Sequence, residues 1–180
     1  MLTPTQQLDQ TDIAILKALQ NNARLTCKEL AAQIHLSTTP TFERWKRLER
    51  EGYIKQYVTM LDAEKLNQGF VVFCHIKMQR IDLEATNNFV KTIRQIPEVT
   101  ECYNISGKFD YLLKVHSENM HQYQQFIINV IGQISYIASL ESTFVMREEK
   151  HELGIYPPSP HTTTSFGMIF VGNKIDRQFF

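Results

Sequence analysis

The chain has 180 residues, of which 43% are hydrophobic and 21% are charged, proportions typical of a globular, soluble protein. Lysine plus arginine number 19, as do aspartate plus glutamate, so the strongly basic balance of many nucleic-acid-binding proteins is absent. The sequence shows neither a signal peptide nor an apolar run of membrane-spanning length, which predicts no membrane contact and a cytoplasmic location.

Capping signals and helical periodicity predict two helices at the start of the chain. Either Asp9 or Thr11 begins the first helix, in which apolar residues recur at helical spacing until an Asn-Asn pair ends it at Asn21. Thr26 and Glu29 then form a capping box, the pattern in which two side chains satisfy each other's free backbone amides. A second helix is therefore predicted to follow Thr26, and a short connection leads on to a third.

The third predicted helix has Thr39 as its N-cap and Pro40 as its first residue, and Gly52 ends it in the left-handed conformation. An apolar stripe is predicted to pack on the first two helices and consists of Phe42, Trp45 and Leu48. The far side is predicted to carry Glu43, Arg44, Arg47 and Arg50. Two helices, a tight turn and a basic helix form the helix-turn-helix layout.

A helix with hydroxyls and cations on its free side can lie in the major groove of DNA and reach phosphates and base edges. The third helix is therefore predicted to bind double-stranded DNA, with Trp45 packed in the core. The alternative is an ordinary amphipathic helix with a solvated charged face. The predicted DNA contacts are Thr38, Thr39, Thr41, Arg44, Arg47, Arg50 and Lys55.

A helix-turn-helix domain is thus predicted over residues 1–58. Within it, residues 53–58 have a β-type pattern and predict a wing or an edge strand beside the helices. Residues 59–69 are polar and contain turn-forming side chains, and they predict a linker.

From Phe70 onward the pattern changes and predicts a second domain over residues 70–152. The predicted strands are 70–78, 99–105, 110–116 and 136–146, and the predicted helices are 83–96 and a helix that Asn119 caps. The order βαββαβ is the ferredoxin-like layout, so the whole chain is predicted to be α+β. Because apolar residues alternate on both faces of strand 70–78, we expect a second copy to cover the open sheet face, forming a homodimer.

Several segments together carry a family resemblance. In the first domain they are residues 8–16, 22–24 and 37–54, and in the second domain they are residues 105–114 and 146–149. In these segments the chain resembles the leucine-responsive regulator/asparagine-regulator (Lrp/AsnC, or feast/famine) family of transcription regulators. The resemblance implies that the second domain senses a small amino acid, and that dimers assemble further into a tetramer or octamer.

The resemblance also implies that the amino-acid effector lies between dimers, against the hairpin turn that contains Gly107. At this turn Gly107 offers close approach of the backbone, and Asp110 offers a carboxylate for an α-ammonium group. Alternatively, both are only turn residues. The effector-binding residues that the resemblance implies are Tyr103, Asn104, Ser106, Gly107, Asp110 and Tyr111.

The remaining features predict no chemistry. Three widely spaced cysteines and six scattered histidines show no metal-ligand spacing, and no hydrolase or phosphate-binding motif occurs. We therefore expect no enzyme activity, no catalytic residue, no metal and no cofactor beyond the effector. Residues 153–180 do not match the family. They contain a proline-rich spacer at 156–160 and a possible strand at 165–172, and neither feature indicates a role for this tail.

The predicted function is that of a sequence-specific, DNA-binding transcription regulator that responds to a small amino acid. The paired third helices of a dimer would enter successive major grooves. An architectural nucleoid protein that binds DNA broadly, without an effector, is the alternative from a different class. A third interpretation is a ligand-sensing subunit of an enzyme complex, with the first domain used for protein contact.

Overall fold

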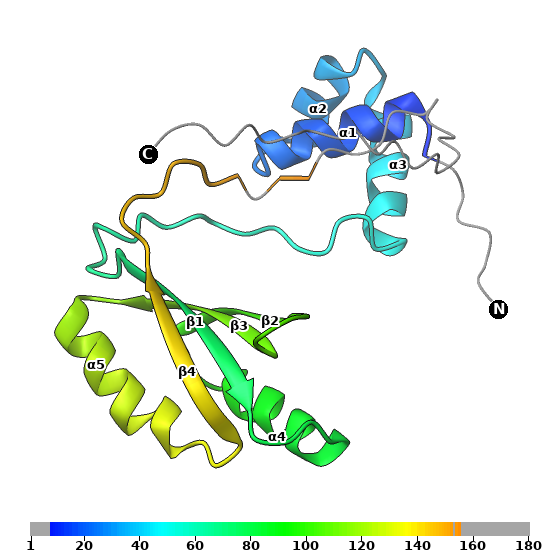
Figure 1. Ribbon diagram of the computed structural model, residues 1–180. Helices are drawn as coiled ribbons and strands as arrows, with labels where there is room; N and C mark the ends of the chain where they lie inside the picture. The colour runs from blue at the N-terminus through cyan, green and yellow to red at the C-terminus, as the bar shows by residue number, and fades with distance from the viewer. Residues whose placement is uncertain (1–7, 153, 156–180) are drawn as a thin grey trace, which may run out of the picture. The chain divides into compact units, whose positions relative to one another are not determined.

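The computed structural model describes residues 8–152, 154 and 155. Among these, the residues up to Thr59 belong to one compact unit and Met60–His151 form another (Figure 1). Each unit has its own hydrophobic core. The spacer and strand predicted in the C-terminal tail lie outside the described residues.

Three helices make up the described part of the first unit: α1 (Gln10–Asn21), α2 (Cys27–Gln33) and α3 (Thr38–Arg50). Asp9 caps α1 and exchanges hydrogen bonds with Asp12, whose backbone amide lies 2.8 Å from the Asp9 carboxylate. Thr26 and Glu29 form the predicted capping box at the start of α2. The helices pack around a core that includes Ile15, Leu19, Leu25, Leu30 and Leu48.

Helix α3 begins two residues earlier than predicted. Ser37 is its N-cap, so Pro40 is the third helical residue and not the first. Pro40 still loses no hydrogen bond, because the first amides of a helix have no partner within it. The earlier start is stabilised by Thr41, whose amide and hydroxyl both donate to the carbonyl of Ser37. Gly52 follows the helix with a φ of +77°, as predicted.

The buried face of α3 also differs from the predicted stripe. Thr41 and Leu48 are fully buried and Trp45 packs against the core, but half of the Phe42 surface is exposed. A three-residue spacing such as 42, 45 and 48 drifts by about 60° per step around a helix of 3.6 residues per turn. Residues 41, 45 and 48 follow the true period, so Thr41 takes the core position that was assigned to Phe42.

The wing predicted at residues 53–58 does not form a strand. The described part of the first unit contains no other strand with which these residues could pair. Instead, the hydroxyl of Tyr57 accepts a hydrogen bond from the Trp45 indole at 2.6 Å and donates to Glu49 at 2.9 Å. These bonds attach the segment to the side of α3.

The second unit has the predicted βαββαβ order. Its elements are β1 (Phe70–Met78), α4 (Leu83–Ile93), β2 (Val99–Asn104), β3 (Tyr111–Ser117), α5 (Met120–Asn129), a 3-10 turn (Ile131–Gln133) and β4 (Ile137–Phe144). The strands form an antiparallel sheet in the order β2-β3-β1-β4, with the helices packed on one face (Figure 1). Several predicted elements were one to three residues too long, because apolar residues continue past the last hydrogen-bonded turn or pair.

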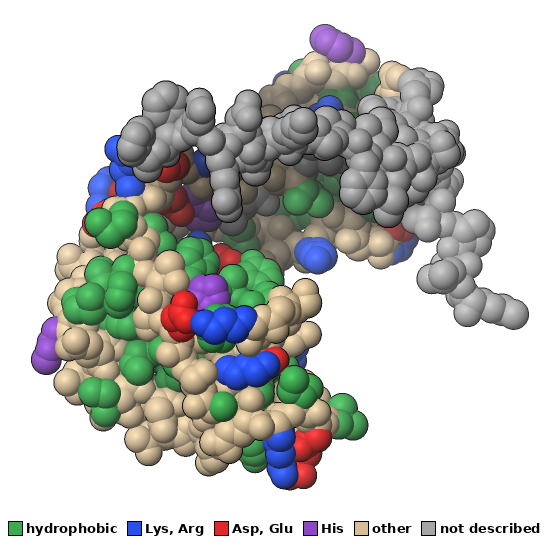
Figure 2. Space-filling view, in the orientation of Figure 1, with side chains coloured by type: hydrophobic (Ala, Val, Ile, Leu, Met, Phe, Trp, Pro, Cys, Tyr) green, Lys and Arg blue, Asp and Glu red, His purple; other side chains and the backbone are tan. Residues whose placement is uncertain are grey.

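One face of β1 forms the centre of the second core. Val72, Cys74, Ile76 and Met78 are buried, as the alternation predicted, and they pack with Phe89 of α4 and other helix residues. On the face drawn in Figure 2, this unit shows several hydrophobic patches, and cationic side chains lie beside acidic ones. No helix in the described part of the chain is long and apolar enough to cross a membrane.

Leu48 fixes α3 to the first core, so we expect Leu48→Ala to lower the unfolding free energy of this unit by about 2–5 kcal/mol. Trp45 is the only tryptophan, and its fluorescence during denaturant unfolding reports on this unit alone. Phe42→Ala, on the exposed side of the same helix, is the matched control and should shift stability by less than about 1 kcal/mol. Equal losses in the two variants would contradict the observed orientation of α3.

Candidate functional site

The free surface of α3 is the first candidate site. Its exposed residues are Thr38, Thr39, Phe42, Glu43, Lys46 and Arg50. Of the predicted DNA contacts, Thr38, Thr39 and Arg50 lie on this surface, and Lys55 is exposed in the segment that follows the helix. Thr41 does not, since it is fully buried and its hydroxyl is bonded to the Ser37 carbonyl. The structure therefore places Thr41 in the core and not on the free surface, and its predicted contact with DNA stays a prediction.

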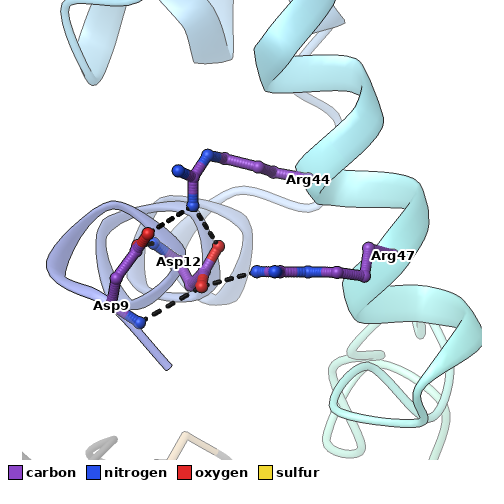
Figure 3. A network of polar contacts seen from close by, with 4 residues as sticks. All are labelled: Asp9, Asp12, Arg44 and Arg47. Atoms are coloured by element: carbon purple, nitrogen blue, oxygen red, sulfur yellow. Dashed lines mark hydrogen bonds and ion pairs between the residues drawn. The ribbon is translucent and has the colours of Figure 1, made fainter. Parts of the chain in front are cut away.

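Arg44 and Arg47 face α1 and not the free side (Figure 3). The Arg44 guanidinium lies 2.9 Å from one oxygen of Asp12, and the Arg47 guanidinium lies 2.6 Å from the other. Arg44 also contacts the carboxylate of Asp9. The predicted placement of both arginines on the far side of the helix is wrong, because Asp12 draws them toward α1.

Asp12 is the buried centre of this network, with only 1% of its surface exposed. A buried carboxylate is stable only when charged donors and hydrogen bonds replace the water that it has lost. Two guanidinium groups and the backbone amide of Asp9 supply them. For Asp9, burial raises the pKa, but hydrogen bonds from the Asp12 amide and from Arg44 lower the pKa to a value below the usual one.

This network sets which side of α3 is free. The side chains of Arg44 and Arg47 are 33% and 22% exposed, so their stems cover the α1 contact while their charged ends hold Asp12. The Nε atom of Arg47 is buried without a hydrogen-bond partner among the described residues. The sequence interpretation treated Asp12 only as a charge near a helix end. At about 100° per residue, Arg47 lies closer to the exposed Glu43 than to the buried Leu48, so only its ion pair with Asp12 shows that it faces α1.

The hairpin turn between β2 and β3 is the second candidate site. Gly107 is exposed there with a φ of +118°, and a side chain at this position would meet no atom within 4 Å. Asp110 is buried and accepts the backbone amide of Met78 at 2.7 Å and the ammonium of Lys77 at 3.0 Å. The Met78 hydrogen bond is the main cause that holds the pKa of the Asp110 carboxyl below its usual value, against the effect of burial.

The other residues implied at this turn have mixed positions. Tyr103 and Ser106 are exposed, and the Tyr103 hydroxyl donates to Glu101. The Asn104 side chain donates to the backbone carbonyl of Asp110 at 2.8 Å and so braces the turn. Tyr111 is only 4% exposed and packs on Phe89, with ring centres 4.6 Å apart, so the structure gives it a place in the core and not on the surface of the turn. Its predicted effector contact stays a prediction.

Both halves of the chain match known domain families. Residues 8–55 match a winged helix-turn-helix DNA-binding domain, and residues 71–155 match the Lrp/AsnC ligand-binding domain. The Bkd operon transcriptional regulator of Pseudomonas aeruginosa is 34% identical over 141 residues, which are 78% of this chain and 92% of that protein. The chain belongs to the Lrp/AsnC family.

Other members of the Lrp/AsnC family agree with this assignment. The leucine-responsive regulatory protein of Escherichia coli is 33% identical over 82% of this chain and 90% of its own length. A Neisseria meningitidis transcriptional regulator, crystallised as a complex with L-Met, superimposes with a TM-score of 0.79 at 34% identity, over 84% of this chain and 96% of that chain. These proteins are transcription regulators, so this Lrp/AsnC chain is a regulator and not an enzyme.

Asp12 holds α3 in place, so we expect Asp12→Asn to lower the unfolding free energy by about 1.5–3 kcal/mol, the range for hydrogen bonds to charged groups. Trp45 fluorescence measures this loss. Asp9→Asn is the matched control: asparagine also caps helices, and the half-exposed Asp9 contact contributes less than about 1 kcal/mol. A loss as large for Asp9→Asn as for Asp12→Asn would contradict the central role of Asp12.

Proposed function

We propose that this Lrp/AsnC regulator binds specific duplex DNA sequences by placing the exposed face of α3 in the major groove. The observation that carries the proposal is the division of α3 into two faces. Thr41, Arg44, Leu48 and part of Trp45 hold the helix from behind, and the opposite face is exposed among the residues that the structure describes. A recognition helix needs this combination of rigid support and a free polar face.

Cations near the free face supply the phosphate contacts in this proposal. Arg50 and Lys55 are both exposed, and neither has an ion pair among the described residues. Such cations gain from binding DNA, because each one that neutralises a phosphate releases condensed counterions. Thr38 and Thr39 at the start of α3 are proposed to hydrogen-bond to base edges or phosphates. Arg44 and Arg47 contribute by positioning the helix.

We further propose that a small amino acid binds at the β2–β3 turn. The match to a ligand-binding domain and the L-Met complex of the Neisseria relative support this proposal. At the turn, Tyr103, Ser106 and Gly107 present exposed groups. Asp110 keeps the shape of the turn through its bonds to Met78 and Lys77, and Asn104 braces it from the backbone side.

The open face of the sheet is proposed to bind a second copy of the chain. Val71, Phe73 and His75 of β1 lie on the face opposite to the core, where they are only partly covered. A homodimer built on this face pairs two α3 helices, which matches two half-sites about one turn of DNA apart. Assembly into a tetramer or octamer, in the cytoplasm, completes the proposal.

The effector then acts through the assembly. An amino acid at the turn that binds one arrangement of dimers more tightly shifts the equilibrium toward it, and the spacing of the DNA-binding units changes with it. A coupling free energy of about 1–3 kcal/mol between the two sites is sufficient for such a response.

A mobility-shift titration tests the DNA half of the proposal. It compares the duplex upstream of the protein's own gene with random duplex of equal length, at several salt concentrations. Arg50→Ala and Lys55→Ala should each weaken binding to all sequences and reduce the salt slope by about 1, as loss of one phosphate contact requires. Lys91→Ala, an exposed lysine of α4, should bind as the wild type does. Equal affinity for both duplexes would instead support a broad architectural role.

A panel of amino acids added to the same titration tests the effector half. Gly107→Val should abolish the response and leave the affinity for DNA without amino acid unchanged, because a β-branched residue is strained at a φ of +118° and fills the exposed turn. The unchanged basal affinity serves as the control for folding. A full response in Gly107→Val would place the effector site elsewhere.

A further inference from the structure

We infer that Phe42 is a specificity-determining residue that contacts the methyl group of a thymine in the major groove. The inference rests on the proposed function, since it assumes that α3 lies in the groove. It differs from the expectation drawn from the sequence, in which Phe42 was a core residue and Arg44 and Arg47 were among the side chains predicted to contact DNA.

The position of Phe42 on the helix is the first support. At about 100° per residue, Phe42 and Lys46 point within about 40° of each other, near the middle of the exposed arc. The buried Thr41 and Leu48 point about 100° and about 120° away from Phe42. Phe42 also lies in the first half of α3, and the N-terminal half of a recognition helix is the part that meets base edges.

The surroundings of Phe42 are the second support. Half of its surface is exposed although it belongs to a helix with a well-packed inner face. The Lys46 ammonium lies 5.7 Å from the centre of its ring and 2.7 Å from the Glu49 carboxylate. These contacts keep the ring beside a cation on the outer side of the helix, where duplex DNA would offer both an apolar group and negative charge.

The chemistry of the major groove indicates which base Phe42 contacts. Thymine is the only base that presents a methyl group in the major groove, and phenylalanine is one of the side chains that contact it. The flanking polar residues can read neighbouring positions: Glu43 can accept from a cytosine amino group, and Lys46 can reach a guanine or a phosphate. A thymine opposite Phe42 is therefore expected in each half-site.

The test removes the methyl group without changing the base pairing. Wild-type protein first enriches its preferred duplex from a randomised pool, and each dT of that duplex is then replaced by dU. At one dT per half-site, the dU duplex should bind the wild type about fourfold more weakly, the change expected when one methyl group is no longer buried. Phe42→Ala should bind the dT and dU duplexes equally, and Phe42→Leu should keep most of the discrimination.

The possible failures are distinguishable. A wild type that enriches a sequence but discriminates at no dT overturns the role of Phe42 and leaves the proposed function intact. Discrimination that persists in Phe42→Ala assigns the methyl contact to another residue and also overturns the inference. A wild type that enriches no sequence overturns the proposed function itself. Unchanged unfolding of both variants by Trp45 fluorescence shows that the comparison concerns contact with DNA and not folding.

Discussion

The buried charge of Asp12 determines how the first unit is arranged. A carboxylate that has lost its water requires charged partners, and Arg44 and Arg47 of α3 are the cations that reach it from the neighbouring helix. Once these two arginines turn toward α1, the rotation of α3 about its axis is set. Thr41 and Leu48 then enter the core, and Phe42 and Lys46 face outward.

The second unit uses a carboxylate in a similar way. Asp110 lies at the end of the hairpin turn, and its oxygens bind the amide of Met78 and the ammonium of Lys77 on β1. Both are inward contacts that tie the turn to the sheet. In each unit, an acidic residue supports a candidate functional surface from behind, and the neighbours that it leaves exposed are the residues proposed to contact DNA or an effector.

Much of the fold follows from local patterns. The capping box of Thr26 and Glu29, the alternation along β1 and the cap at Asn119 were confirmed, and of the two possible starts of the first helix the structure has Asp9. These features depend on residues close in the sequence. The local patterns predicted the candidate sites less completely than the fold. Thr41, Arg44 and Arg47 were assigned to DNA because hydroxyls and cations on a helix usually face outward, and Tyr111 was assigned to the effector although its ring packs on Phe89.

The sequence by itself determined the order of elements, the two-part organisation and the family, since periodicity, caps and motif spacing are properties of short segments. Only the tertiary structure decided which side of α3 is free and which residues of the hairpin turn are exposed. The physical reason is that a polar residue gives the same pattern in the sequence whether its side chain faces water or a buried partner. Asp12 and Arg47 are 35 residues apart in the chain, and their contact exists only after α1 and α3 pack together.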